Sequence, residues 1–206
     1  MNGIIGKKRG MTRVFSETGE DIPVTVVEAG PCYVMQVKTG DKDGYQAVQL
    51  GFDPKKEQRA SKPEKGIAKK AGVEPMSILK EFDYSGEEPE LGDEVTVEIF
   101  ESGDQVSVTG TTKGRGFSGV VRRHGFKGGP KTRGQSDKWR APGAIGASAD
   151  PSRVFPGTRM PGQHGNKKDT QTGLTVVATD PEKNVLLVKG AVPGPKNGYL
   201  IIRKAQ

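Results

Sequence analysis

The side chains best suited to chemistry in this chain are cations, and they gather in one internal block. Residues 113–168 hold 13 Lys or Arg and two acidic residues, a net charge of +11. The other 150 residues hold 19 bases and 23 acids, a net charge of −4. Such a concentration of positive charge is typical of a protein with a polyanionic partner, as nucleic-acid-binding proteins have.

Histidine and cysteine are too few and too scattered to predict an enzyme or a metal site. The chain has two histidines, His124 and His164, and a single cysteine, Cys32. Their spacing matches neither a zinc site nor a Ser- or Cys-based triad. We therefore expect no catalytic residue, no metal, no cofactor and no small-molecule substrate. One cysteine also excludes an internal disulfide and favours a reducing compartment, and we expect Cys32 to be a small buried side chain.

Three glycines raise dinucleotide binding as an alternative. Gly114, Gly116 and Gly119 form the pattern G-x-G-x-x-G after a strand-like segment. However, HGFKGGPKTRGQ follows at the place where the next strand of a dinucleotide-binding unit is required. The surrounding density of Lys and Arg is also unusual for that motif, in which backbone amides bind the phosphates.

The same cations, spaced by Gly and Pro, suit a segment that threads along RNA. Residues 113–168 contain 12 Gly and five Pro and show no sustained apolar period. Burial therefore cannot offset the ordering entropy of this segment, ~1–2 kcal/mol per backbone residue. We predict that it folds on RNA, whose phosphates the cations neutralise. The predicted RNA-binding residues are Lys113, Arg115, Arg122, Arg123, Lys127, Lys131, Arg133, Lys138, Trp139, Arg140, Arg153, Arg159, Lys167 and Lys168.

Trp139 has two possible roles. Because it lies between two cations, it is predicted either to stack on an unpaired base or to join a small apolar cluster with Phe126 or Ile145.

Two smaller basic segments also have alternative interpretations. Residues 55–72 are predicted to carry a surface helix at 63–71 that stops at Gly72, and their charges either contact RNA or are solvated. A possible second RNA patch, with solvated surface as an equal alternative, consists of Lys7, Lys8, Arg9 and Arg13.

The segments on both sides of the basic block are predicted to be strands of one domain. Two apolar-rich runs around the Thr18-Gly19 turn predict a hairpin, and GDKDG at 40–44 predicts a tight turn. No crossover helices appear, which favours a mainly β fold with an antiparallel sheet closed as a barrel. Residues 1–112 and 169–206 would form this barrel, and 113–168 a long irregular insertion with one short helix in FSGVVRRHGF. Further strands are predicted at CYVMQVKT, YQAVQLGF, SILKEF, VTVEIF, QVSVTGT, GLTVVATD, NVLLVKG and GYLIIR.

The apolar runs are too short for a membrane protein. The start of the chain has basic residues but no following apolar run, so no signal peptide is predicted. The longest aliphatic run, VLLV at 185–188, is far shorter than a bilayer requires. We expect a soluble cytosolic protein with no membrane partner.

Six motifs spread along the chain resemble those of the bacterial form of large-subunit ribosomal protein three. Archaeal and eukaryotic members of that family are longer, so the length of 206 residues favours a bacterial protein. The motifs are GKKRGMTRVF near the start, AVQLGF at 47–52, VTGTTKGRGFSGVVRRHGFKGGP at 108–130, RAPGAIG at 140–146, RVFPGTRMPGQHGN at 153–166 and LLVKGAVPGP at 186–195.

The resemblance implies a translation-protein-type β-barrel with one or two short helices and a long basic extension. It implies a structural constituent of the large subunit of the cytoplasmic ribosome that binds 23S ribosomal RNA near its 3′ domain. It further implies a part in early subunit assembly, contacts with neighbouring large-subunit proteins, and an extension that reaches toward the peptidyl transferase centre. The alternative is a free-standing RNA- or DNA-binding regulatory protein. The residues implied to lie near that centre are Gly157, Thr158, Arg159, Met160, Gln163 and His164.

One modification and a few departures from the family pattern also follow from the resemblance. In some bacteria the glutamine of the matching G-Q-M-G-N motif is N-methylated, which maps to Gln163. This chain has His164 where methionine is usual, Ala144 for serine, Trp139 for histidine and Arg133 for histidine. These changes affect particular base contacts, and His164 alters how a methylating enzyme meets Gln163, but the phosphate-binding role stays intact.

Overall fold

The computed structural model describes residues 1–16, 18–84 and 89–205. The chain divides into two compact units, Met1–Thr112 with Lys168–Gln206, and Lys113–Lys167. The second unit is inserted between neighbouring strands of the first, because Thr111 in one strand pairs with Lys168 in the next. The sequence prediction placed Lys168 in the insertion. In the structure Lys168 is the first residue of a strand of the first unit.

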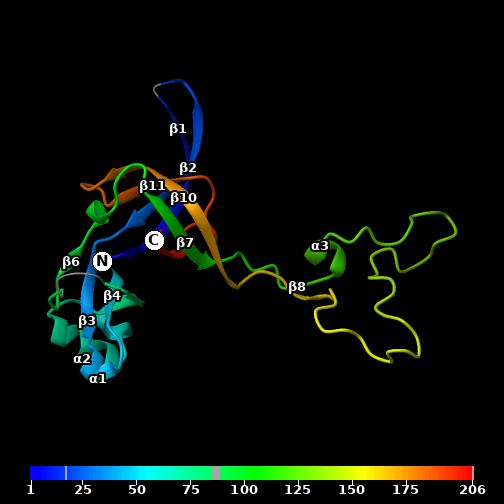
Figure 1. Ribbon diagram of the computed structural model, residues 1–206, viewed down its shortest axis with the longest axis horizontal. Coiled ribbons are helices and arrows are strands. Elements are labelled where there is room, and N and C mark those ends of the chain that lie inside the picture. Colours follow the sequence, from blue (N-terminus) through cyan, green and yellow to red (C-terminus); the bar gives the residue numbers. More distant parts are fainter. Residues whose placement is uncertain (17, 85–88, 206) are drawn as a thin grey trace. The chain divides into compact units, whose positions relative to one another are not determined.

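Six antiparallel strands of the first unit close into a barrel, in the order β1-β12-β7-β10-β11-β2 (Figure 1). Alternate residues face the core, as Leu200 and Ile202 of β12 do, because successive side chains of a strand point to opposite faces. The predicted antiparallel barrel is confirmed. Its strands are β1 Gly3–Phe15, β2 Asp21–Ala29, β7 Gln105–Thr111, β10 Lys168–Asp180, β11 Val185–Lys189 and β12 Tyr199–Lys204.

The other predicted strands of the first unit form a separate four-stranded sheet, in the order β5-β4-β3-β6. The six barrel strands already close on themselves, so these strands pair with one another. Strand β4 pairs with its sequence neighbours β3 and β5, whereas β6 pairs with the distant β3, with Val95 opposite Cys32. Val34, Leu50 and Phe82 of this sheet are buried in the same apolar cluster as Ile4 and Ile202 of the barrel. The strands are β3 Cys32–Lys38, β4 Ala47–Pro54, β5 Met76–Phe82 and β6 Glu94–Val95.

The strand predicted at 95–100 is mostly wrong. Strand β6 ends at Val95, and a 3₁₀ turn, η2 Val97–Ile99, follows it. Val97 and Phe100 are both buried, because the three-residue period of this turn places them on one side. The alternating apolar residues of VTVEIF imitate a strand, but packing against the core decides the local structure.

The described residues contain three short α-helices and a further 3₁₀ turn, and none of the helices is long and apolar enough to cross a membrane. The helices predicted near 63–71 and within 117–126 are both present, and the predicted turn at 40–44 contains a single helical turn. The elements are α1 Gly40–Asp43, η1 Glu57–Arg59, α2 Lys62–Ala71 and α3 Val120–His124.

Cys32 is fully buried, as predicted. Its Sγ donates to the carbonyl oxygen of Ile5 at 3.4 Å, and burial raises the pKa of the thiol to about 12. The thiol therefore stays protonated and unreactive in the folded first unit.

Candidate nucleic-acid interface

The inserted unit, Lys113–Lys167, is described in full and has almost no core of its own. Its only buried residues are Ser118 and Val120. It carries twelve Lys or Arg and two aspartates. Its regular elements are α3 and two strands of two residues each, β8 Phe117–Ser118 and β9 Gly162–Gln163.

The two ends of this unit meet in a short ladder. Strands β8 and β9 pair antiparallel, with Phe117 opposite Gln163. Beside them the amide of Arg115 donates to the carbonyl oxygen of His164 at 2.8 Å, and the amide of His164 donates to Gly116 at 2.9 Å. We call residues 113–125 together with 160–167 the hub.

Glycine is required where the two ends of the hub approach most closely. Gly165 has φ +70°, and a Cβ there would lie 2.0 Å from the carbonyl oxygen of Lys113. A larger residue would strain the backbone and push the two segments apart. No sequence pattern predicts this role, because Lys113 and Gly165 are far apart in sequence and no local motif pairs their segments.

Two side chains of helix α3 contact the carbonyl oxygen of Met160, in the segment 160–167 of the hub. Arg123 donates from Nη1 to the carbonyl oxygen of Met160 at 2.7 Å, and Nε2 of His124 lies 3.1 Å from the same oxygen. Arg123 is consequently half-buried, and all other predicted RNA-binding residues are exposed. Its guanidinium thus positions the hub as well as adding charge.

His164 lies in a strongly positive environment. Burial lowers the pKa of His164 below its usual value, and the charges of Arg115, Arg122, Arg123 and Lys167 lower it further. Its Nδ1 is buried and has no hydrogen-bond partner among the described residues. The ring is therefore neutral at pH 7.

Trp139 lies in the long loop 126–159, where hydrogen bonds hold its indole N–H and its backbone carbonyl. The indole Nε1 donates to the carbonyl oxygen of Gln135 at 3.2 Å, and the backbone carbonyl of Trp139 accepts from Gly129 at 2.9 Å. The side chain is 43% exposed, whereas the ring of Phe126 contacts His124 at a centroid distance of 6.0 Å. This arrangement favours the stacking role over a cluster with Phe126.

The segment implied to approach the peptidyl transferase centre is mostly accessible. Gly157, Arg159 and Gln163 are exposed, while Thr158 and Met160 are half-buried. The amide nitrogen of the Gln163 side chain, the atom that a methyltransferase would modify, lies 3.5 Å from the carbonyl oxygen of Gly165.

The four cations near the start of the chain lie on β1 and engage partners within the first unit. Lys7 pairs with Asp53 at 3.1 Å, Arg9 pairs with Glu28 at 2.6 Å, and Arg13 pairs with Asp21 at 3.2 Å. Lys8 donates to the carbonyl oxygens of Val192 and Gly194. Carboxylates thus offset three of the four positive charges. This patch therefore has less net positive charge to attract a polyanion than the inserted unit has.

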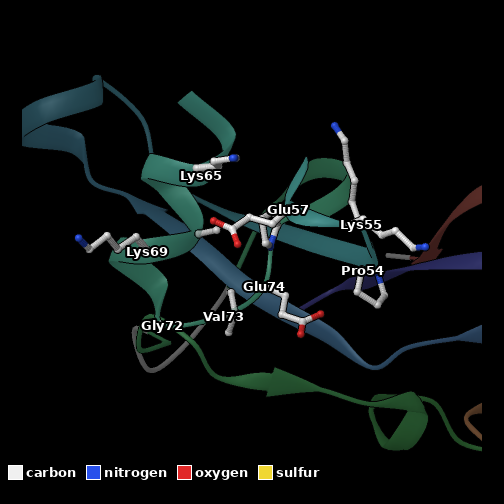
Figure 2. Close-up of a pocket in the computed structure, with 11 residues that line it drawn as sticks. Pro54, Lys55, Glu57, Lys65, Lys69, Gly72, Val73 and Glu74 are labelled. Atoms are coloured by element: carbon white, nitrogen blue, oxygen red, sulfur yellow. The ribbon is translucent and has the colours of Figure 1, made fainter. Parts of the chain in front are cut away.

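The basic segment 55–72 borders an open hollow of about 750 Å³ beside α2 (Figure 2). Lys65 and Lys69 extend from the helix, and Glu57 and Glu74 line the same hollow. Side chains of both charge signs therefore line the hollow. Its charge favours neither RNA contact nor solvation for this segment. Within the described residues, no group of three His, Cys, Asp or Glu is arranged to hold a metal.

Comparison with known proteins decides the family. The family model described as ribosomal protein L3 matches residues 64–184, more than half of the chain. The chain belongs to the ribosomal protein L3 family. Members of this family are structural components of the ribosome and not enzymes, so the glycine pattern at 114–119 is not a dinucleotide-binding motif here. The hub and the long loop lie within the matched region.

Relatives of the L3 family match this chain over nearly its full length. The large ribosomal subunit protein uL3 of Chlorobaculum tepidum is 54% identical over 204 residues, 98% of both chains. That of Chloroherpeton thalassium is 55% identical with the same coverage. That of Herpetosiphon aurantiacus is 53% identical over 207 residues, which cover 100% of this chain and 97% of that protein. These organisms are bacteria, in agreement with the predicted bacterial form.

Proposed function

We propose that this L3-family chain is a structural constituent of the large ribosomal subunit and that its inserted unit binds 23S ribosomal RNA directly, near the 3′ domain. The observation that carries the proposal is the contrast within residues 113–167 between twelve cations and a single buried apolar side chain, Val120. A segment so poor in core needs an external partner to define its shape. The relatives are large ribosomal subunit proteins by name, which makes the large subunit the proposed source of that partner.

The proposed contacts are those of cations with phosphates. Exposed Arg and Lys of the inserted unit neutralise phosphate groups and release counterions, and the exposed face of Trp139 stacks on an unpaired base. The barrel unit docks on RNA and on neighbouring large-subunit proteins. The segment 157–168 approaches the peptidyl transferase centre, where it shapes catalytic RNA without taking part in the reaction.

The same proposal includes early action in subunit assembly and N-methylation of Gln163. Gln163 is exposed on β9, so a modifying enzyme has access to its side chain before the RNA covers it. Mass spectrometry of the natively expressed chain tests this part, with one added methyl group on the peptide that contains Gln163 as the expected result.

Salt-dependent RNA binding tests the central claim. Arg133→Ala and Arg140→Ala each remove an exposed cation from the long loop, so each variant should lower the slope of log affinity against log salt by roughly one. Lys183→Ala is the matched control, because Lys183 lies in the β10–β11 turn and pairs with Asp180. Equal slopes in all three variants would mean that the loop cations do not face phosphate.

Selectivity separates a ribosomal component from a free-standing regulator. A ribosomal component prefers a structured large-subunit RNA fragment over duplex DNA and short RNA, and it co-sediments with large subunits. Preference for a short defined site, together with absence from the large-subunit fraction, would overturn the proposal in favour of a regulator.

A further inference from the structure

The hub of the inserted unit carries four cations whose charges act on the His164 ring. Every charged side chain that shifts the pKa of His164 is a cation, whereas the aspartates of this unit, Asp137 and Asp150, lie in the long loop. The side-chain charges that act on the His164 ring are therefore positive. The cations are Arg115, Arg122, Arg123 and Lys167.

Hydrogen bonds hold Arg115 and the helix that carries Arg122 and Arg123 near His164 without a ligand. Arg115 is joined to His164 by the ladder at 2.8 Å, and Arg122 belongs to α3. The helix is tied to Met160 by Arg123. A site that is already assembled loses less conformational entropy when it binds a ligand. A bound anion also reduces the electrostatic repulsion among neighbouring cations.

We propose that Arg115, Arg122 and Lys167 bind one RNA phosphate beside His164, and that protonation of His164 strengthens this contact. The inference rests on the proposed RNA-binding function and names one anchor within it. Arg123 acts as the positioning residue, because its guanidinium already donates to Met160.

The pH dependence follows from the charges that face the ring. In the free chain, burial and the surrounding cations keep the pKa of His164 below its usual value. A bound phosphate offsets those cations and raises that pKa, so the affinity for RNA increases as the pH falls through the pKa of the complex. His124 of α3 is the other histidine of the hub, and its Nε2 faces the carbonyl oxygen of Met160.

Affinity measured at two pH values with the full chain tests the site. At constant salt, wild-type protein should bind a structured large-subunit RNA fragment about 5- to 10-fold more tightly at pH 5.5 than at pH 7.5, since one pKa unit corresponds to a factor of ten. His164→Met should lose most of this gain, measured as the ratio of the affinities of this variant at the two pH values. Arg153→Ala, which removes an exposed cation of the long loop, should lower the salt slope and keep the pH gain.

Nuclear magnetic resonance of the two histidine rings supplies a second readout. Inorganic sulfate keeps its charge over this pH range, and it should raise the pKa of His164 more than chloride does at equal ionic strength. Arg115→Ala should reduce that rise, because it removes a side chain of the site and leaves the backbone ladder intact.

Two different failures can be told apart. Steeply salt-dependent RNA binding with an undiminished pH gain in His164→Met would overturn the phosphate site and leave the proposed function standing. Absence of salt-dependent binding to the RNA fragment would remove the proposed function itself, and the site with it.

Discussion

Gly128 shows how one residue without a side chain sets the path of the long loop. It has φ +77°, and a Cβ there would lie 2.1 Å from the carbonyl oxygen of Trp139. The next amide, that of Gly129, donates to this same carbonyl at 2.9 Å. The residue that carries the proposed stacking ring is therefore positioned by a glycine eleven positions earlier in the sequence.

We predict that Gly128→Ala weakens binding to the large-subunit RNA fragment by about tenfold, in line with a local strain of ~1–3 kcal/mol. The slope of affinity against salt should stay the same, because the substitution removes no charge. Gly134→Ala is the matched control, because its Cβ would meet no atom within 4 Å and its φ is not positive. Equal affinities of the two variants would mean that the loop does not keep this path on RNA.

Helix α2 shows how a local signal in the sequence specifies an element. Glu64 accepts from the amide of Ser61 and from Lys55, each at 2.8 Å, and completes a capping box with Ser61. The helix ends at Gly72, whose φ of 71° suits glycine and whose amide donates to Ala68. Both ends of this helix are thus fixed by residues within or next to it.

We predict that Ser61→Ala destabilises the first unit by about 1 kcal/mol at pH 7, measured by urea denaturation. The exposed Lys70→Ala on the same helix is the control and should change the unfolding free energy little. A loss in the control as large as that in Ser61→Ala would show that the cap is not responsible.

The pH dependence of α2 has a defined sign. The hydrogen bonds from Lys55 and from the Ser61 amide lower the pKa of Glu64 to about 2. The contribution of Glu64 to stability is therefore complete above its usual pKa of 4.5 and is lost as the pH falls toward 2. Hydrogen exchange of α2 amides should show protection that declines over this range in the wild type and stays flat in Glu64→Gln.

Elements defined by local patterns could be predicted, and those defined by distant partners could not. The hairpin around Gly19 and helix α2 carry turn and capping residues, and their positions were predicted correctly. The separation of β3–β6 into a second sheet depends on which strands of the chain close the barrel, and these include strands far apart in sequence. The β8–β9 pair joins residues more than 40 positions apart, and its strands of two residues are too short for a periodic signal.

The candidate site was predictable in composition but not in geometry. Charge and glycine content marked residues 113–168 as RNA-binding, and the exposed positions of nearly all the predicted cations agree with that role. No sequence pattern indicated that Arg123 would bind the carbonyl oxygen of Met160 or that the charges of four cations would act on His164. Both depend on the hub, and the hub depends on long-range backbone pairing.

At the scale of the whole molecule, burial and charge are divided between the two units. Among the described residues, every buried apolar side chain except Val120 lies in the unit of Met1–Thr112 and Lys168–Gln206, and the excess positive charge of the sequence lies in the other unit. One unit therefore has the apolar burial that stabilises a fold in water, and the other has little beyond the hydrogen bonds of the hub. Their stabilities are expected to differ accordingly.

Hydrogen exchange on the free protein and on its RNA complex checks this division. In the free protein, amides of the barrel strands β7 and β12 should exchange slowest, those of the hub ladder at an intermediate rate, and those of loop 126–159 nearly as fast as an unstructured peptide. Addition of the large-subunit RNA fragment should protect the loop strongly and the barrel little further. If the loop of the free protein exchanged as slowly as β12, it would have a fold independent of RNA, and the reason for its many cations would have to be sought in a partner that binds an already rigid surface.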